Sequence, residues 1–256
     1  LTVFSDCHGN LENAIRILTE SEADCYLFCG DGIRDAESAA DLLDKRLIAV
    51  LGNCDRGETG EAERLLELDG VRILLTHGHG YSVKSSLLPL RRRVNAVNVD
   101  LKSFSDDFYR DYCGGRLQPV LDNLKAIKAL GWWLEVTTLV IPGCNDSEAE
   151  LRDMAAFVHG ELGPDTPWHL SAFHGAYHMA GHPSTPPARL EDAWRIGREA
   201  GLHFVYIGNV ASALGGTTFC PACGAPAIER RGWQTRQLGA PGQCPSCKAA
   251  LPGVWR

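Results

Sequence analysis

The sequence lacks an apolar run of about 18 residues, the length needed to cross a bilayer. Basic residues are also few: 25 lysines and arginines stand against 32 acidic residues, for a net charge of -7. The one compact basic run is residues 91–93, which we interpret as a solvated helix end. The composition therefore argues against a membrane protein and against a general nucleic-acid-binding surface. It does not indicate any protein partner.

The sequence has no initiator methionine and no leader made of a charged stretch followed by an apolar one. It begins at Leu1, directly in an apolar run, so we expect a fragment or an incomplete gene model. Ten cysteines without such a leader favour metal ligands and reduced thiols over disulfides. We therefore expect a cytoplasmic protein.

Four short apolar runs, at residues 1–4, 25–29, 47–51 and 71–75, each precede polar residues that can bind metal. In chain order these residues are Asp6 with His8, then Asp31, Asn53 and His77. Ligands of open α/β sheets bind at the carboxyl ends of the strands. Carboxylate and amide oxygens and imidazole nitrogens suit divalent ions such as manganese, nickel, iron or zinc. The pattern predicts a two-metal phosphoesterase with a small phosphorylated substrate.

The motifs D-x-H-G-N, G-D, G-N-C-D and T-H-G-H, in this order, resemble those of the calcineurin-like metallophosphoesterases, in their small bacterial and archaeal phosphodiesterase branch. The resemblance covers residues 1–93. It implies that Asp6, His8, Asp31, Asn53 and His77 are metal ligands, and that Asn53 and His77 also act on the substrate. It further implies a closing G-H-x-H turn and a second sheet, and we find neither in this sequence.

A second series of strands and helices begins at Val94. We expect strands at residues 94–102, 134–141, 168–173 and 203–207. A helix should begin at Ser147, because Ser147 and Glu150 form a capping-box pattern ahead of an apolar helical stripe. Repeated strand–helix units of this size indicate a parallel barrel or an open sheet.

The segments VNVDLKSFS, LEVTTLVIPGCNDS, PWHLSAFH and FVYIGNV resemble the later strands of radical S-adenosylmethionine (SAM) enzymes. The similarity is to the pyruvate formate-lyase activating enzyme branch and the AmmeMemoRadiSam system, over residues 94–256. It implies that Asp100, Lys102, Thr137, Asn145 and His169 face the barrel mouth around cofactor and substrate. These enzymes hold a [4Fe–4S] cluster with C-x3-C-x2-C, a motif that this sequence lacks. We therefore expect neither the cluster nor S-adenosylmethionine to bind here.

Two C-x2-C pairs, Cys220 with Cys223 and Cys244 with Cys247, lie near the end of the sequence. Four thiolates at this spacing suit a tetrahedral, structural Zn²⁺ site, and Gly224 permits the tight turn after the first pair. Cys25 and Cys29 lie in an apolar run without a third cysteine nearby, so we interpret them as buried thiols.

The sequence thus predicts an α/β chain in three parts. Residues 1–93 form a partial metallophosphoesterase layer, 94–215 a partial radical-SAM-type (β/α) barrel, and 216–256 a four-cysteine zinc ribbon. Three hypotheses on function remain. The chain is a metal-dependent phosphoesterase acting on a phosphomonoester or phosphodiester, a radical SAM homologue that is inactive or needs a missing part, or a non-enzymatic or artefactual fusion joined near Arg93.

Overall fold

The computed structural model describes residues 1–7, 9–68, 71–77, 96–175, 179–210, 212, 214–231 and 234–255. The chain forms two compact units, one mainly of Leu1–Val94 and the other of Asn95–Arg231 with Thr235–Arg256. In the described ranges, no helix has the length and apolar character that a membrane span requires.

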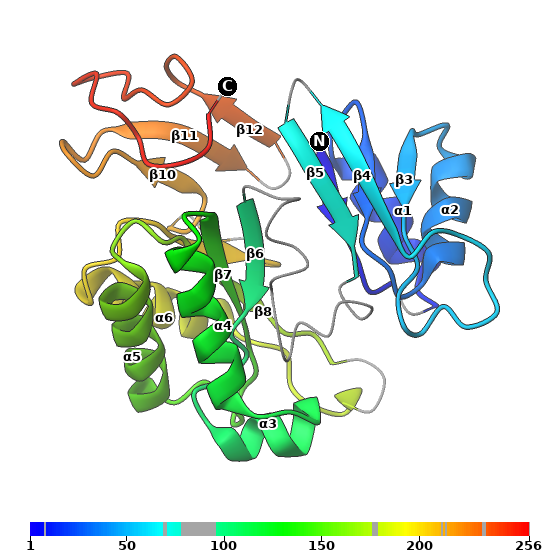
Figure 1. The fold of residues 1–256 in the computed structure, drawn as a ribbon, viewed down its shortest axis with the longest axis horizontal. Helices are drawn as coiled ribbons and strands as arrows, with labels where there is room; N and C mark the ends of the chain where they lie inside the picture. The colour runs from blue at the N-terminus through cyan, green and yellow to red at the C-terminus, as the bar shows by residue number, and fades with distance from the viewer. Residues whose placement is uncertain are drawn as a thin grey trace. The chain divides into compact units, whose positions relative to one another are not determined.

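The first unit is built on a parallel sheet in the order β1 (Thr2–Phe4), β2 (Tyr26–Phe28) and β3 (Leu47–Ala49). Helix α1 (Leu11–Glu20) connects β1 to β2, and helix α2 (Ile33–Leu42) connects β2 to β3 (Figure 1). Both helices cover one face of the sheet, where they bury a core that includes Phe4, Ala14, Leu18, Tyr26, Phe28 and Ala36.

The opposite face of this sheet is covered by an antiparallel hairpin of β4 (Glu63–Leu68) and β5 (Val71–Thr76). Leu27 in β2 and Val50, directly after β3, pack with three residues of the hairpin: Leu66, Ile73 and Leu75. The fourth predicted strand is therefore present, but it lies outside the parallel sheet. The expectation that the segment lacks a second sheet is wrong, because this hairpin supplies a two-stranded one.

The second unit contains a parallel sheet in the order β6 (Ala96–Asp100), β7 (Trp133–Val140), β8 (Trp168–Ala172) and β9 (Val205–Gly208). Its helices are α3 (Asp106–Cys113), α4 (Leu117–Ala129), α5 (Glu148–Phe157) with a π-helical extension (Val158–Leu162), and α6 (Pro187–Glu199). Side chains of β7 alternate between buried and half-buried. One face of the sheet therefore packs against helices, and polar residues such as Glu135 and Thr137 occupy the other.

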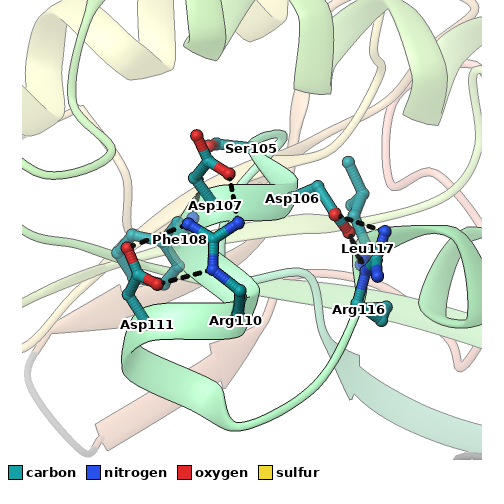
Figure 2. A network of polar contacts seen from close by, with 8 residues as sticks. All are labelled: Ser105, Asp106, Asp107, Phe108, Arg110, Asp111, Arg116 and Leu117. Atoms are coloured by element: carbon teal, nitrogen blue, oxygen red, sulfur yellow. Dashed lines mark hydrogen bonds and ion pairs between the residues drawn. The ribbon is translucent and has the colours of Figure 1, made fainter.

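The corner between α3 and α4 is fixed by ionic contacts (Figure 2). Ser105 caps α3 by accepting a hydrogen bond from the Phe108 N–H. The Asp106 carboxylate forms an ion pair with Arg116 at 2.8 Å and accepts the Leu117 N–H at 3.0 Å. Leu117 is the first residue of α4, whose own N-cap position is Arg116 and provides no side-chain acceptor. Asp106 therefore caps α4 from the neighbouring helix.

The chain ends in a three-stranded sheet of β10 (Thr217–Phe219), β11 (Pro226–Arg231) and β12 (Gln234–Gln237). A small cluster around Cys220, Cys244 and Leu251 forms its core. The predicted architecture is confirmed: an α/β layer, a partial parallel (β/α) unit and a small cysteine-bearing ribbon.

Candidate metal centres

Asp6, Asp31 and His77 come together at the strand ends of the first unit. They follow β1, β2 and β5, and their ligand atoms all lie within 4.8 Å of one another. The His77 Nε2 lies 3.4 Å from the Asp31 Oδ2. Asp31 is buried, whereas Asp6 is exposed, so the cluster opens to solvent on the Asp6 side. Three of the five predicted ligands therefore form one group.

Both aspartates of this group have left-handed backbones, with φ of +59° at Asp6 and +65° at Asp31. Such conformations are uncommon for residues other than glycine and are concentrated at functional sites. The Asp6 N–H donates to the Gly30 carbonyl at 3.0 Å, which ties the turn after β1 to the turn after β2. The left-handed backbone conformations and this hydrogen bond between the two turns thus help to set the directions of the two carboxylates.

The turns after β2 and β3 touch backbone to backbone. A β-carbon on Gly30 would lie 2.6 Å from the Gly52 nitrogen, and one on Gly52 would lie 2.0 Å from the Asp31 Oδ1. Only glycine allows this approach at position 52. The buried carboxylate of Asp31 therefore lies directly against the backbone of the next turn.

Asp55, a residue to which the sequence assigned no role, holds the same two turns. Its carboxylate accepts four backbone hydrogen bonds, from Asp31, Gly32, Ile33 and Gly52, at 2.7–3.0 Å. Burial acts to raise the pKa of Asp55, but these four donors outweigh it and the pKa is lowered. Asp55 is therefore held as a carboxylate, and its oxygens are engaged by backbone N–H groups of the two turns. The G-N-C-D motif is the sequence signal that marks it.

Asn53 and Cys54 lie beside the three-residue group, in the turn after β3. The Cys54 N–H donates to the Asp31 Oδ1 at 2.8 Å. A hydrogen bond to Asp31 also raises the pKa of the exposed Cys54 thiol. The exposed Asn53 amide donates to the Cys54 sulfur at 3.3 Å. Asn53 is thus on the solvent side of the turn that holds Asp31, while His8 lies outside the described residues.

Two thiols near this group have raised pKa values. Burial, followed by the charge of Asp35, raises the pKa of Cys7 to about 11, and burial raises that of Cys29 to about 11. Cys7 belongs to the apolar core beneath α1 and α2, and Cys29 packs beside the second core. Both therefore stay protonated at neutral pH and behave as apolar packing groups.

The four cysteines of the ribbon form the second candidate centre. Their sulfur atoms all lie within 4.8 Å of one another. The backbone N–H groups of Cys247 and Ser246 lower the pKa of Cys244 to about 6. Each C-x2-C pair closes a turn of the same kind, with Gly224 N–H donating to Cys220 O and Lys248 N–H to Cys244 O. These paired turns bring four sulfurs together as a tetrahedral metal ion requires.

The residues expected near a barrel mouth occupy the polar face of the second unit's sheet. Asp100 pairs in register with Thr137, Thr137 with His169, and His169 with Tyr206, so one row crosses all four strands. The His169 Nε2 lies 2.8 Å from the Glu135 Oε2, and the His169 ring stacks on Tyr206. Their assignment to cofactor binding stays a prediction.

Lys102 and Asn145 lie beyond the strand ends. The Lys102 ammonium forms a 2.8 Å ion pair with Asp100. The fully buried Asn145 amide bonds only to backbone among its described contacts, accepting from Ile141 N–H and donating to the carbonyls of Leu139 and Lys102. These contacts join the turn after β7 to the turn after β6.

Comparison with known proteins shows two kinds of relative. Residues 1–102 match the model of the calcineurin-like phosphoesterase superfamily domain, which ends beyond the boundary predicted at Arg93. The probable metallophosphoesterase YsnB of Bacillus subtilis is 32% identical over 105 residues, 40% of this chain and 60% of that protein. The isethionate sulfite-lyase activating enzyme of Oleidesulfovibrio alaskensis is 35% identical over 78 residues, 30% of this chain and 25% of that protein.

A further relative is the uncharacterized protein MJ0808 of Methanocaldococcus jannaschii, with 39% identity over 176 residues. This alignment covers 69% of the chain and is longer than the phosphoesterase match, so it includes residues beyond Lys102. The chain spans about half the length of MJ0808, at 51%. Both resemblances recognised in the sequence, to phosphoesterases and to lyase-activating enzymes, are confirmed.

Proposed function

We propose that the calcineurin-like phosphoesterase domain carried by residues 1–102 hydrolyses the phosphate ester of a small molecule, using a divalent metal ion. The observation that carries this proposal is the convergence of Asp6, Asp31 and His77 within 4.8 Å. Each residue follows a different strand, so their meeting is a product of the fold and not of sequence proximity.

The donor atoms fit the implied metal. Two carboxylates and one imidazole form a hard to borderline set that suits Mn²⁺, Fe²⁺, Ni²⁺ or Zn²⁺. A divalent ion held there would supply charge neutralisation for a phosphoryl group and a hydroxide at neutral pH. The matching family model and the similarity to a probable metallophosphoesterase support the same assignment.

The surrounding residues prepare this site for an anionic substrate. The Cys54 N–H fixes one oxygen of Asp31, and the other oxygen faces His77. The carboxylate is therefore oriented before any ligand arrives, which lowers the cost of ordering it. Asn53, exposed at the rim, has an amide N–H₂ group that can donate to a phosphate oxygen. We propose a phosphomonoester or phosphodiester as the substrate.

Hydrolysis of bis(p-nitrophenyl) phosphate and p-nitrophenyl phosphate with added Mn²⁺ tests the proposal. We expect metal-dependent release of p-nitrophenol that is lost in Asp31→Asn, an isosteric change that removes one ligand oxygen and the charge. Asp24→Asn, which changes an exposed aspartate in the loop before β2, is the matched control and should keep wild-type rates. Failure to hydrolyse either substrate with Mn²⁺, Ni²⁺, Fe²⁺ or Zn²⁺ would reject the proposal.

We further propose that Cys220, Cys223, Cys244 and Cys247 bind one structural Zn²⁺. The four sulfurs leave no position for a substrate in a tetrahedral site, so the ion would stabilise the ribbon. Metal analysis of the purified chain should give about one zinc per chain at this site. Cys220→Ser should lose it, whereas Cys113→Ser, in α3, should retain it.

A further inference from the structure

The turns after β2 and β3 share a single anionic centre, the carboxylate of Asp55. The Oδ1 accepts the N–H groups of Gly32 at 2.7 Å and Ile33 at 3.0 Å, at the start of α2. The Oδ2 accepts those of Asp31 at 2.9 Å and Gly52 at 2.8 Å. Both oxygens therefore bridge backbone groups, and three of the four donors belong to the turn that carries Asp31.

This arrangement distinguishes Asp55 from the metal-binding residues. Its oxygens are engaged by N–H groups, and it is absent from the described group of side chains whose ligand atoms converge on one point. The Asp55 carboxylate also lies at the amino end of α2, where the helix dipole favours a negative charge.

The position of Asp31 depends on this centre. Its backbone is left-handed, a conformation that its neighbours must maintain because the residue itself disfavours it. Its N–H is held by Asp55, and its side-chain Oδ1 is held by the N–H of Cys54, the residue before Asp55. One turn thus fixes both the backbone and the side chain of the buried ligand.

We propose that Asp55 is a positioning residue that sets the affinity of the site for its divalent ion by holding Asp31 in its strained, metal-ready conformation. The inference rests on the proposed phosphoesterase function and adds the residue that controls metal loading. Asp55 does not bind the metal. Its removal raises the metal concentration needed for activity more than it lowers the rate at saturating metal.

The variant that tests this is Asp55→Asn, which keeps the shape of the side chain. An amide has one acceptor oxygen, so its N–H₂ group must face two of the four backbone donors. Asp24→Asn makes the same chemical change at an exposed position of the same unit and serves as the control. Circular dichroism and thermal melting establish that each variant is folded at the measuring temperature.

Two readouts are needed. Calorimetric titration with Mn²⁺ should show at least tenfold weaker binding for Asp55→Asn and unchanged binding for Asp24→Asn. The kcat at saturating Mn²⁺ should fall much less than the activity at limiting Mn²⁺. Equal Mn²⁺ affinity in Asp55→Asn and the wild type would overturn the proposal. Activity that no Mn²⁺ concentration restores would also overturn it, because it would make Asp55 a direct participant.

Amide hydrogen exchange provides a readout that needs no metal. Peptides covering residues 29–36 and 50–56 should exchange at least tenfold faster in Asp55→Asn than in Asp24→Asn. If the wild type binds no Mn²⁺, the phosphoesterase proposal fails, and exchange alone then decides whether Asp55 holds the turns. Unchanged exchange would overturn the positioning role. If Asp55→Asn does not fold, Asp55→Glu, which retains the charge but displaces both oxygens, undergoes the same measurements with the same criteria.

Discussion

Gly52 lies so close to Asp31 that a β-carbon on the glycine would fall 2.0 Å from the carboxylate Oδ1 and 2.3 Å from the Asp31 nitrogen. No side chain can enter this contact without moving the buried Asp31. The position of the Asp31 carboxylate therefore depends on the absence of a side chain at Gly52.

Gly52→Ala should abolish most metal-dependent hydrolysis. The added methyl group must displace Asp31 or the turn after β3, and overpacking of this kind costs about 1–3 kcal/mol of stability. Activity assays at saturating Mn²⁺ and urea unfolding measure the two effects. Gly57→Ala is the control: its β-carbon meets nothing within 4 Å, and its φ of +87° carries only a backbone penalty. Wild-type activity in Gly52→Ala would show that the contact is not needed.

Lys248→Gly should stabilise the ribbon. Lys248 has a φ of +62° in the second cysteine turn, where the first turn has Gly224 at +73°. The left-handed conformation of a lysine costs about 1–2 kcal/mol of stability, which glycine would recover. Two effects reduce this gain: the variant loses the hydrogen bond from Lys248 to the Pro245 carbonyl, and glycine gives the unfolded chain more conformational entropy. We expect the zinc-loaded variant to resist chelator-induced unfolding better than the wild type. Gly224→Ala should resist less well, and the reverse order would contradict the explanation.

Asp106→Asn should reduce the sensitivity of the second unit to acid. The hydrogen bond and ion pair from Arg116 lower the pKa of Asp106 below its usual value of 3.8, with help from the Leu117 N–H (Figure 2). A carboxyl with a lowered folded pKa stabilises the fold above its unfolded pKa, and this contribution disappears as pH falls through the folded value. Urea unfolding at a series of acidic pH values should therefore show a shallower decline for Asp106→Asn. Asp153→Asn, on α5, controls for the loss of one exposed carboxylate.

Asn145→Ala should destabilise the second unit by about 2–4 kcal/mol, because it leaves the buried Ile141 N–H and two carbonyl groups without their partner. Chemical denaturation with tryptophan fluorescence as a probe measures this loss. Gln118→Ala removes an exposed amide bonded to Asp122 on α4 and should change stability by less than about 0.5 kcal/mol. Comparable losses in both variants would contradict the role assigned to burial.

The convergence of Asp6, Asp31 and His77 could be predicted because each follows an apolar run, and the carboxyl ends of strands in α/β folds lie at one edge of the sheet. The sheet membership of β5 could not, since its apolar sequence suits a parallel strand and a hairpin equally well. Its partner β4 escaped prediction because Glu63, Arg64 and Glu67 interrupt the apolar residues that mark a strand. His77 nevertheless reaches Asp31, because the hairpin packs on the opposite face of the same sheet.

The role of Asp55 could not be predicted from its residue type. Its role depends on four backbone N–H groups from two turns, and every residue has such a group, so composition and spacing do not reveal which ones converge. Asp100, Thr137 and His169 present the opposite case. Their strands are recognisable from apolar patterns, the expectation that they share one end of the sheet comes from the resemblance to radical SAM enzymes, and the register of the strands puts them in one row.

Two sulfur pairs in the ribbon cross between its two turns: Cys220 lies 3.7 Å from Cys247, and Cys223 lies 3.6 Å from Cys244. An oxidant acting on the metal-free chain could therefore join cysteines from opposite turns. Each such bond would join the beginning of the ribbon to its end, instead of sealing one small ring. Sulfurs joined in such bonds would no longer be thiolates, so the oxidised ribbon could not bind a metal ion until a reductant restored them.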